Sequence, residues 1–292
     1  MANLFKSIMN RSDDDEELDL EFDIHEAESN CFELPPDKEN NQVLAVWGSP
    51  SSGKTTMSVK LARYIASQKK NVILVLADMT APPLPYICPP SDLEDENSLG
   101  AILGAAHVTG NLIKQNAILH KRNEYLTMLA MKNGENAFSY PPFTETQAQE
   151  LLSELRRMAD YIIIDCTSNI TNDVLSAVSL IESDAVLRLV SCDLKSISYL
   201  NSQLPLLLDN KFNANKQYKA ASNVGDFQAD ENVEQVVGGV SVRIAHSDEV
   251  HQQFLAGNLF GALTDKKAFL DDVYEREAVS STGIGNGIAI PH

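Results

Sequence analysis

Positive charge is scarce in this sequence. Lys and Arg together number 23 against 41 Asp and Glu, which gives a formal net charge of −18 over 292 residues. Nucleic acids and anionic membranes both attract positively charged protein surfaces. The composition therefore argues against either of them as a general partner.

Long apolar runs are also missing. No stretch of about 18 apolar residues occurs, so we expect no segment to span a bilayer. Residues 1–20 lack the apolar run of a secretory signal peptide. Because 43% of all residues are hydrophobic, the chain can still form a core that needs no disulfide or metal for stability.

Closely spaced metal-ligating residues are absent as well. The cysteines lie far apart and form no CxxC pair: Cys31, Cys88, Cys166 and Cys192. Four of the histidines share no metal-ligand spacing, and we expect them at the surface or at helix caps: His107, His120, His246 and His251. This pattern indicates a reduced, cytoplasmic protein with neither a disulfide framework nor a zinc site.

The N-terminal segment 1–42 differs in composition from the rest. It holds 13 acidic residues against Lys6, Arg11 and Lys38, so we expect it to be mostly disordered. Apolar residues at helical spacing within 1–11 could form an amphipathic turn that contacts a membrane, and a frayed terminus is the alternative.

The remainder alternates apolar strand patterns with helical patterns. Strands are predicted at 42–47, 71–77, 161–164, 185–190, 217–222 and 240–245, and helices at 55–68, 99–118, 144–158, 172–181, 194–210 and 248–256. Continuous apolar strands separated by helices imply a mostly parallel sheet covered on both faces. The predicted fold is therefore a doubly wound α/β domain over residues 43–262, followed by a tail at 263–292.

The strongest chemical signal lies between the first strand and the first helix. It fits the phosphate-loop pattern G-x-x-x-x-G-K-[ST] in full and comprises Gly48, Ser49, Pro50, Ser51, Ser52, Gly53, Lys54 and Thr55, with Thr56 directly after it. Backbone N–H groups of such a loop face phosphate oxygens at the positive end of the helix. Lys54 would contact the β- and γ-phosphates and Thr55 would bind Mg²⁺. The alternative is an ordinary Gly/Ser/Pro turn.

Two carboxylates follow buried strands and complete this expectation. Asp165 ends the strand pattern at 161–164, where a carboxylate can hold Mg²⁺ through water. Asp78 follows 71–77 and could orient or activate the attacking water, and the alternative is a helix or turn cap.

The segments 43–79 and 159–193, which contain these motifs, resemble the ParA/MinD superfamily of P-loop ATPases, and the resemblance covers roughly residues 43–260. The segment 243–250 is similar to the family's late strand followed by Pro-x-Asp-x-x-Val. The resemblance implies a nucleotide-switched dimer that binds ATP and Mg²⁺ through the residues above. It also implies that Asn223 contacts adenine, although Asn before Val-Gly equally suits a plain turn.

One position departs from the family pattern. Its members usually carry a second lysine early in the loop that reaches the partner's phosphates, and Ser49 stands at that position here. Serine cannot stabilise the charge that develops on a transferred phosphoryl group. Pro50 in addition removes one backbone N–H from the loop. We therefore expect ATP hydrolysis that is slow or depends on a partner.

By the same resemblance, this chain would position or recruit a macromolecular assembly such as a pilus, secretion, plasmid or division complex. Within the superfamily it leans towards the pilus-localising TadZ/CpaE-like branch. Its cargo or activator would be a protein, and the chain would be cytoplasmic, with recruitment to the inner membrane face by a partner. The alternative is a nucleotide-binding scaffold without turnover.

The tail carries a second resemblance, to an unrelated family. The stretch 265–292, which ends GIGNGIAIPH, looks like the active-site segment of sugar phosphotransferase enzyme IIA of the fructose/mannitol type. That resemblance implies that His292 is a phosphoryl acceptor, a role that histidine chemistry permits. The alternative is a remnant or a truncated fusion without phosphocarrier activity.

Overall fold

The computed structural model of the protein describes residues 42–93, 97–207, 209–225 and 238–263. The predictions made for the N-terminal acidic segment up to residue 41 and for His292 lie outside these residues. Among the described helices, none is both long and apolar enough to cross a membrane.

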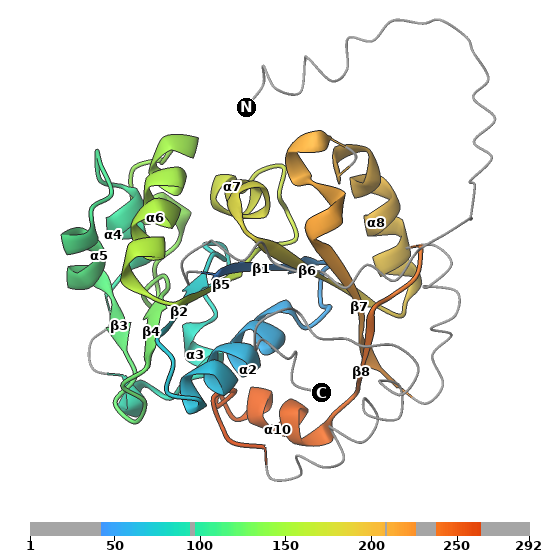
Figure 1. The fold of residues 1–292 in the computed structure, drawn as a ribbon. Coiled ribbons are helices and arrows are strands. Elements are labelled where there is room, and N and C mark those ends of the chain that lie inside the picture. The colour runs from blue at the N-terminus through green and yellow to red at the C-terminus, as the bar shows by residue number, and fades with distance from the viewer. Residues whose placement is uncertain (1–41, 94–96, 208, 226–237, 264–292) are drawn as a thin grey trace, which may run out of the picture. The chain divides into compact units, whose positions relative to one another are not determined.

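One sheet organises the described part of the chain (Figure 1). Its eight strands lie in the order β3-β4-β2-β5-β1-β6-β7-β8. All neighbours are parallel except β3 and β4. The strands are β1 (Gln42–Gly48), β2 (Val72–Leu76), β3 (Ile118–Leu119), β4 (Leu126–Leu129), β5 (Tyr161–Asp165), β6 (Ala185–Ser191), β7 (Gln217–Val224) and β8 (Val242–Ala245).

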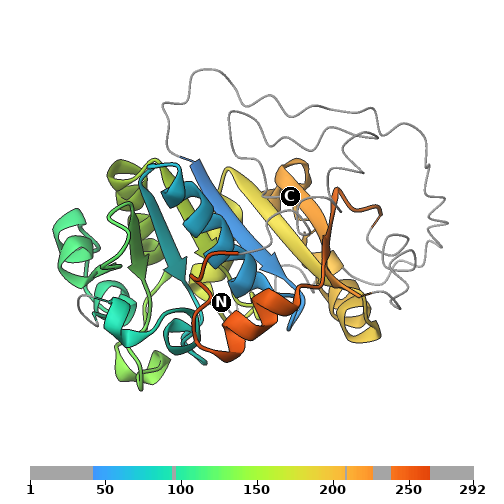
Figure 2. The ribbon, with the colours of Figure 1, turned by 90° about the horizontal axis from the view of Figure 1, so that it is seen from below.

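Helices cover both faces of this sheet, as Figures 1 and 2 show. The helices α6, α7 and α8 lie on one face, and α2, α3 and α10 lie on the other. The helices are α2 (Lys54–Ser67), α3 (Leu84–Ile87), α4 (Leu99–Leu103), α5 (Gly110–Asn116), α6 (Glu145–Met158), α7 (Val174–Glu182), α8 (Leu194–Leu207) and α10 (Asp248–Leu255). Short 3₁₀ turns are η1 (Pro90–Asp92), η2 (Ala137–Ser139), η3 (Asn210–Phe212) and η4 (Ala214–Lys216).

Alternating side chains of the central strands fill a core on each face. In β1, Ala45 and Trp47 belong to the core under α6 and α7, whereas Val46 belongs to the core under α2. Burial on both faces explains why the central strands have no polar alternation. The predicted doubly wound α/β architecture is therefore confirmed.

One predicted helix was wrong in extent. The span 99–118 contains two short helices, because Gly104 ends α4 and the side chain of Thr109 accepts from Leu112 N to begin α5. The strands β3 and β4 were not predicted, since two and four residues are too short to show a period. Both lie at the far edge of the sheet.

The connections place three strand ends together. Val46 of β1 pairs with Asp165 of β5, and Leu76 of β2 pairs with the same Asp165. The residues that follow β1, β2 and β5 therefore emerge at one edge, where open α/β sheets bind ligands.

Candidate functional site

The segment from β1 to α2 has the backbone of a phosphate-binding loop. A Cβ atom on Gly48 would lie 1.9 Å from the carbonyl oxygen of Leu189 in β6, so only glycine fits there. Ser51 and Gly53 have φ angles of 64° and 80°, which curl the loop before the first turn of α2. Alternating backbone conformations of this kind turn successive N–H groups toward one point.

Two serines of the loop are buried and serve to hold its shape. Ser52 Oγ donates to Ser49 O at 2.8 Å. Ser49 Oγ lies 2.8 Å from Ser196 Oγ of α8, and both Ser49 and Ser52 are 0% exposed. The Ser49 side chain therefore points into the protein, toward α8.

Lys54 reaches across the loop. Its Nζ donates to Ser49 O at 3.0 Å and to Ser168 Oγ at 2.6 Å, and Ser168 Oγ donates in turn to Gly48 O. Burial lowers the pKa of Lys54, and the nearby carboxylate of Asp165 opposes that shift. An anion bound in the loop would replace these neutral partners with charge-assisted hydrogen bonds.

Thr55 and Asp165 lie side by side at the start of α2. Thr55 Oγ1 donates to Asp165 Oδ2 at 2.6 Å, and Ser58 Oγ donates to Asp165 Oδ1 at 3.3 Å. Burial raises the pKa of Asp165 to about 6, although Thr55 and Lys54 both favour the charged form. A hydroxyl and a buried carboxylate form an oxygen donor set, which fits Mg²⁺.

Asp78 is a turn cap, and it also faces the larger cavity at the site. Its Oδ1 accepts from the backbone N–H groups of Thr80 and Ala81, both at 2.9 Å. The structure thus contains the turn cap that was the alternative to the water-orienting role. Because neither of these bonds uses Oδ2, the cap leaves that oxygen available to a water molecule.

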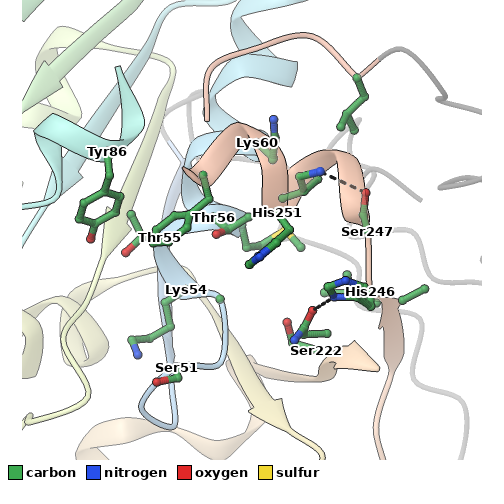
Figure 3. Close-up of a pocket in the computed structure, with 18 residues that line it drawn as sticks. Ser51, Lys54, Thr55, Thr56, Lys60, Tyr86, Ser222, His246, Ser247 and His251 are labelled. Atoms are coloured by element: carbon green, nitrogen blue, oxygen red, sulfur yellow. Dashed lines mark hydrogen bonds between the residues drawn. The ribbon is translucent and has the colours of Figure 1, made fainter. Parts of the chain in front are cut away.

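Two cavities meet at the loop and share Ser51, Lys54 and Thr55. The larger, about 900 Å³, is lined by residues that include Pro50, Asp78 and Asp165. The smaller, about 420 Å³, extends past Gly53 and Thr56 toward β7, β8 and α10 (Figure 3). The loop residues Ser51, Lys54 and Thr55 therefore lie at the junction of the two cavities.

Asn223 lines the smaller cavity from a β-bulge rather than from a plain turn. The register between β7 and β8 shifts at Ser222 and Val224, and Asn223 has a φ of 58°. A bulge re-aims a side chain. Asn223 Oδ1 lies 2.7 Å from His246 Nδ1, while His246 Nε2 lies 3.2 Å from Asp248 Oδ1.

Sequence reasoning missed several residues of the smaller cavity. His246 and His251 are both exposed, as expected for surface histidines. They also line this cavity, with ring centroids 6.2 Å apart, and that placement was not predicted. Tyr86 of α3 lies on the opposite side, as Figure 3 shows. The available signal was His246 itself, which stands where the family-like segment usually has proline.

Comparison with family models gives two matches. The model described as AAA domain matches residues 50–219. The model described as phosphoenolpyruvate-dependent sugar phosphotransferase system, EIIA 2, matches residues 249–292. The second match begins within α10, before the tail boundary expected at residue 263. A search of curated proteins gave no match.

Solved structures with the same fold include three ParA- or MinD-like proteins. A ParA family ATPase from Chlorobium tepidum TLS has a TM-score of 0.62 at 16% identity, covering 75% of this chain and 91% of that one. The cell division ATPase MinD from Pyrococcus furiosus has a TM-score of 0.59 at 16% identity, covering 75% and 90%. A putative plasmid partition protein from Borrelia burgdorferi B31, bound to AMPPNP, has a TM-score of 0.60 at 15% identity, covering 80% and 96%. Since the AAA domain model matches more than half of the sequence, the chain belongs to that family and has the fold of the ParA/MinD-like P-loop ATPases.

Proposed function

We propose that this protein binds ATP with Mg²⁺ and acts as a nucleotide-switched dimer that positions or recruits a macromolecular assembly. One observation carries the proposal. Thr55 Oγ1 and Asp165 Oδ2 lie 2.6 Å apart at the mouth of a curled glycine loop, with Lys54 beside them. This arrangement supplies the oxygen ligands and the cation that a magnesium-bound triphosphate needs.

The site supports slow or partner-dependent hydrolysis. Among the described residues that line the larger cavity, Lys54 is the only Lys or Arg. Ser49 contributes no charge because its hydroxyl is neutral, and its side chain is buried 2.8 Å from Ser196 Oγ rather than lining this cavity. A second cation would have to come from a partner, and such a cation contributes orders of magnitude to phosphoryl transfer in other enzymes.

A second copy of the chain is the proposed partner in the ATP state. Phe138 of η2 is 99% exposed and lines the larger cavity. A single exposed ring is common on protein surfaces, so Phe138 supports this contact only through its place at the proposed nucleotide cavity. The names of the similar structures, which include cell division and plasmid partition proteins, support a positioning role.

The experiment is calorimetry with ATP and MgCl₂. We expect one ATP per chain for the wild type and at least tenfold weaker binding for Lys54→Ala, whereas Lys114→Ala, an exposed site in α5, should bind like the wild type. Light scattering with a nonhydrolysable analogue then tests dimerisation. Equal ATP affinity of Lys54→Ala and the wild type would contradict the proposal.

A measurement of ATP hydrolysis distinguishes the proposed ATPase from the alternative, a nucleotide-binding scaffold without turnover. Single-turnover hydrolysis of bound ATP, measured with and without candidate protein partners, should show a measurable rate for a switch. ATP binding and dimerisation without any hydrolysis would favour a nucleotide-binding scaffold.

A phosphocarrier role for His292 is a second candidate, favoured by the EIIA 2 model match over 249–292. The domain arrangement that goes with both candidates is an acidic segment at 1–42, an ATPase domain at 43–262 and an enzyme IIA-like tail at 263–292. Incubation with a phosphohistidine donor protein tests the role. Acid-labile label that disappears in His292→Ala would support it, and absence of label in the wild type would remove it.

For cellular location we propose the cytoplasm, with recruitment to the inner membrane face by a partner and an accessory contact through residues 1–11. Nucleic acid is not a proposed partner, because the net charge of −18 repels it.

A further inference from the structure

Three metal-ligating side chains converge away from the phosphate loop. Ligand atoms of Cys88, Asp92 and His120 all lie within 4.8 Å of one another. Their positions in the chain gave no metal-binding spacing. Among the described residues, no other group of three His, Cys, Asp or Glu comes this close together.

The backbone holds these residues in place independently of their side chains. Cys88 follows α3, and its N–H donates to Leu84 O at 3.3 Å. Asp92 ends η1, and its carbonyl oxygen accepts from Lys121 N at 2.8 Å. His120 follows β3 and forms an antiparallel bridge with Leu93. A ligand could therefore bind here without first ordering a loop.

The cluster is largely removed from water. Cys88 is 1% exposed and Asp92 is 7% exposed, while His120 is half-buried. The Asp92 carboxylate has an ion pair with Arg122 at 2.8 Å, made by Oδ1 to a side chain that is 75% exposed. A buried carboxylate is costly unless it is well paired or bound to a metal, and an ion pair with an exposed arginine is weak.

We propose that Cys88, Asp92 and His120 form a binding site for Zn²⁺. A sulfur, a nitrogen and an oxygen donor together suit zinc, whereas Mg²⁺ prefers oxygen ligands alone. In a tetrahedral zinc site the ligand atoms lie about 3.5 Å apart, so contraction of about 1 Å suffices. A water molecule would be the fourth ligand of the zinc ion.

Zinc binding would remove one proton from the cluster, that of the Cys88 thiol. Burial raises the pKa of the Cys88 thiol to about 12, with Asp92 adding to the shift, and burial lowers the pKa of His120. Without metal the cluster therefore holds a thiol and a neutral imidazole. Zinc binding forms a sulfur–zinc bond and releases the thiol proton to solvent.

The site is separate from the proposed nucleotide site. None of Cys88, Asp92 and His120 lines either of the two cavities at the phosphate loop. His120 packs its ring edge-to-face against Phe260, with ring centroids 5.5 Å apart. Zinc binding should consequently not require ATP.

The test uses the full chain, stripped of metal and kept in excess MgCl₂ so that oxygen sites are filled. Zinc affinity is measured by competition with a chromogenic chelator, and Co²⁺ serves as a spectroscopic probe because a cobalt–thiolate bond gives a charge-transfer band. The variants are Cys88→Ser and His120→Gln, with Cys192→Ser, a half-buried cysteine outside the cluster, as the matched control.

We expect one Zn²⁺ per chain, at least tenfold weaker binding in Cys88→Ser and in His120→Gln, and wild-type affinity in Cys192→Ser. The cobalt–thiolate band should vanish only in Cys88→Ser. Arg122→Gln is an exposed substitution that should preserve the fold. It should strengthen zinc binding at least threefold, because it removes a competing cation from Asp92.

Two results would overturn the proposal. One is the absence of zinc binding in both the wild type and Arg122→Gln. The other is zinc affinity that is unchanged in Cys88→Ser and His120→Gln, which would place the metal elsewhere in the chain.

Discussion

Asp165→Asn should stabilise the protein in the absence of ligand while it weakens magnesium-dependent nucleotide binding. The carboxylate is 3% exposed, and burial raises its pKa from 3.8 to about 6. At neutral pH the native state therefore holds a charge that burial disfavours. Asparagine keeps an oxygen that can accept from Thr55 and removes the charge.

The direction in which the free energy of unfolding changes with pH follows from proton linkage. Between pH 3.8 and about 6 the native protein binds more protons at Asp165 than the unfolded chain does, so its free energy of unfolding falls as pH rises through this window. The pKa difference corresponds to about 3 kcal/mol. We expect Asp165→Asn to gain about 1–3 kcal/mol above pH 6.5 and to show no gain below pH 4.

Urea denaturation with EDTA and without nucleotide measures this effect. The single tryptophan, Trp47, is fully buried in β1 and reports unfolding by fluorescence. Asp160→Asn is the matched control, because Asp160 precedes the same strand β5 and is exposed. It should change stability by less than about 0.5 kcal/mol. Unfolding free energies of the wild type and Asp165→Asn that stay parallel from pH 4 to pH 7.5 would refute the reasoning.

Three further predictions concern Gly48 of the phosphate loop, Asn223 and His246 of the smaller cavity, and the exposed Phe138. Gly48→Ala should lower the free energy of unfolding by about 3 kcal/mol, measured in urea, because its Cβ would lie 1.9 Å from Leu189 O. Asn223→Ala should weaken ATP binding about fivefold in calorimetry, by loss of about one hydrogen bond, and His246→Ala should weaken it less, since it acts through Asn223. An Asn223→Ala affinity equal to the wild type would exclude that contact. Phe138→Ser should leave the melting temperature unchanged, because the ring is 99% exposed, yet it should reduce ATP-dependent dimerisation in light scattering. Unchanged dimerisation would place the partner contact elsewhere.

Local patterns predicted most of the central sheet. The strands β1, β2, β5 and β6 have five to seven residues, are mostly apolar and are buried on both faces, with Arg188 of β6 as a buried exception. Each was expected within two residues of its observed bounds. The edge of the sheet was not predictable in this way. Its strands β3 and β4 are too short to carry a period, and the break between α4 and α5 depends on Gly104 and the Thr109 cap.

The residues of the candidate site likewise differ in whether the sequence could predict their placement. Gly48, Gly53, Lys54 and Thr55 are adjacent in the chain, so their chemistry is visible in the sequence. Asp165 could be expected because a parallel sheet brings strand ends to one edge. By contrast, the inward direction of the Ser49 hydroxyl depends on Ser196 in α8, far away in the chain.

The amino-acid sequence by itself determined the α/β class, the phosphate loop and the two carboxylates near it, because each depends on neighbouring residues or on the common direction of parallel strands. Only the tertiary structure decided what distant segments build together. Asn223 meets His246 through a bulge between β7 and β8, and Cys88, Asp92 and His120 meet where the segment after α3 crosses the end of β3. Such contacts depend on how loops pack against a finished sheet, and no local spacing encodes them.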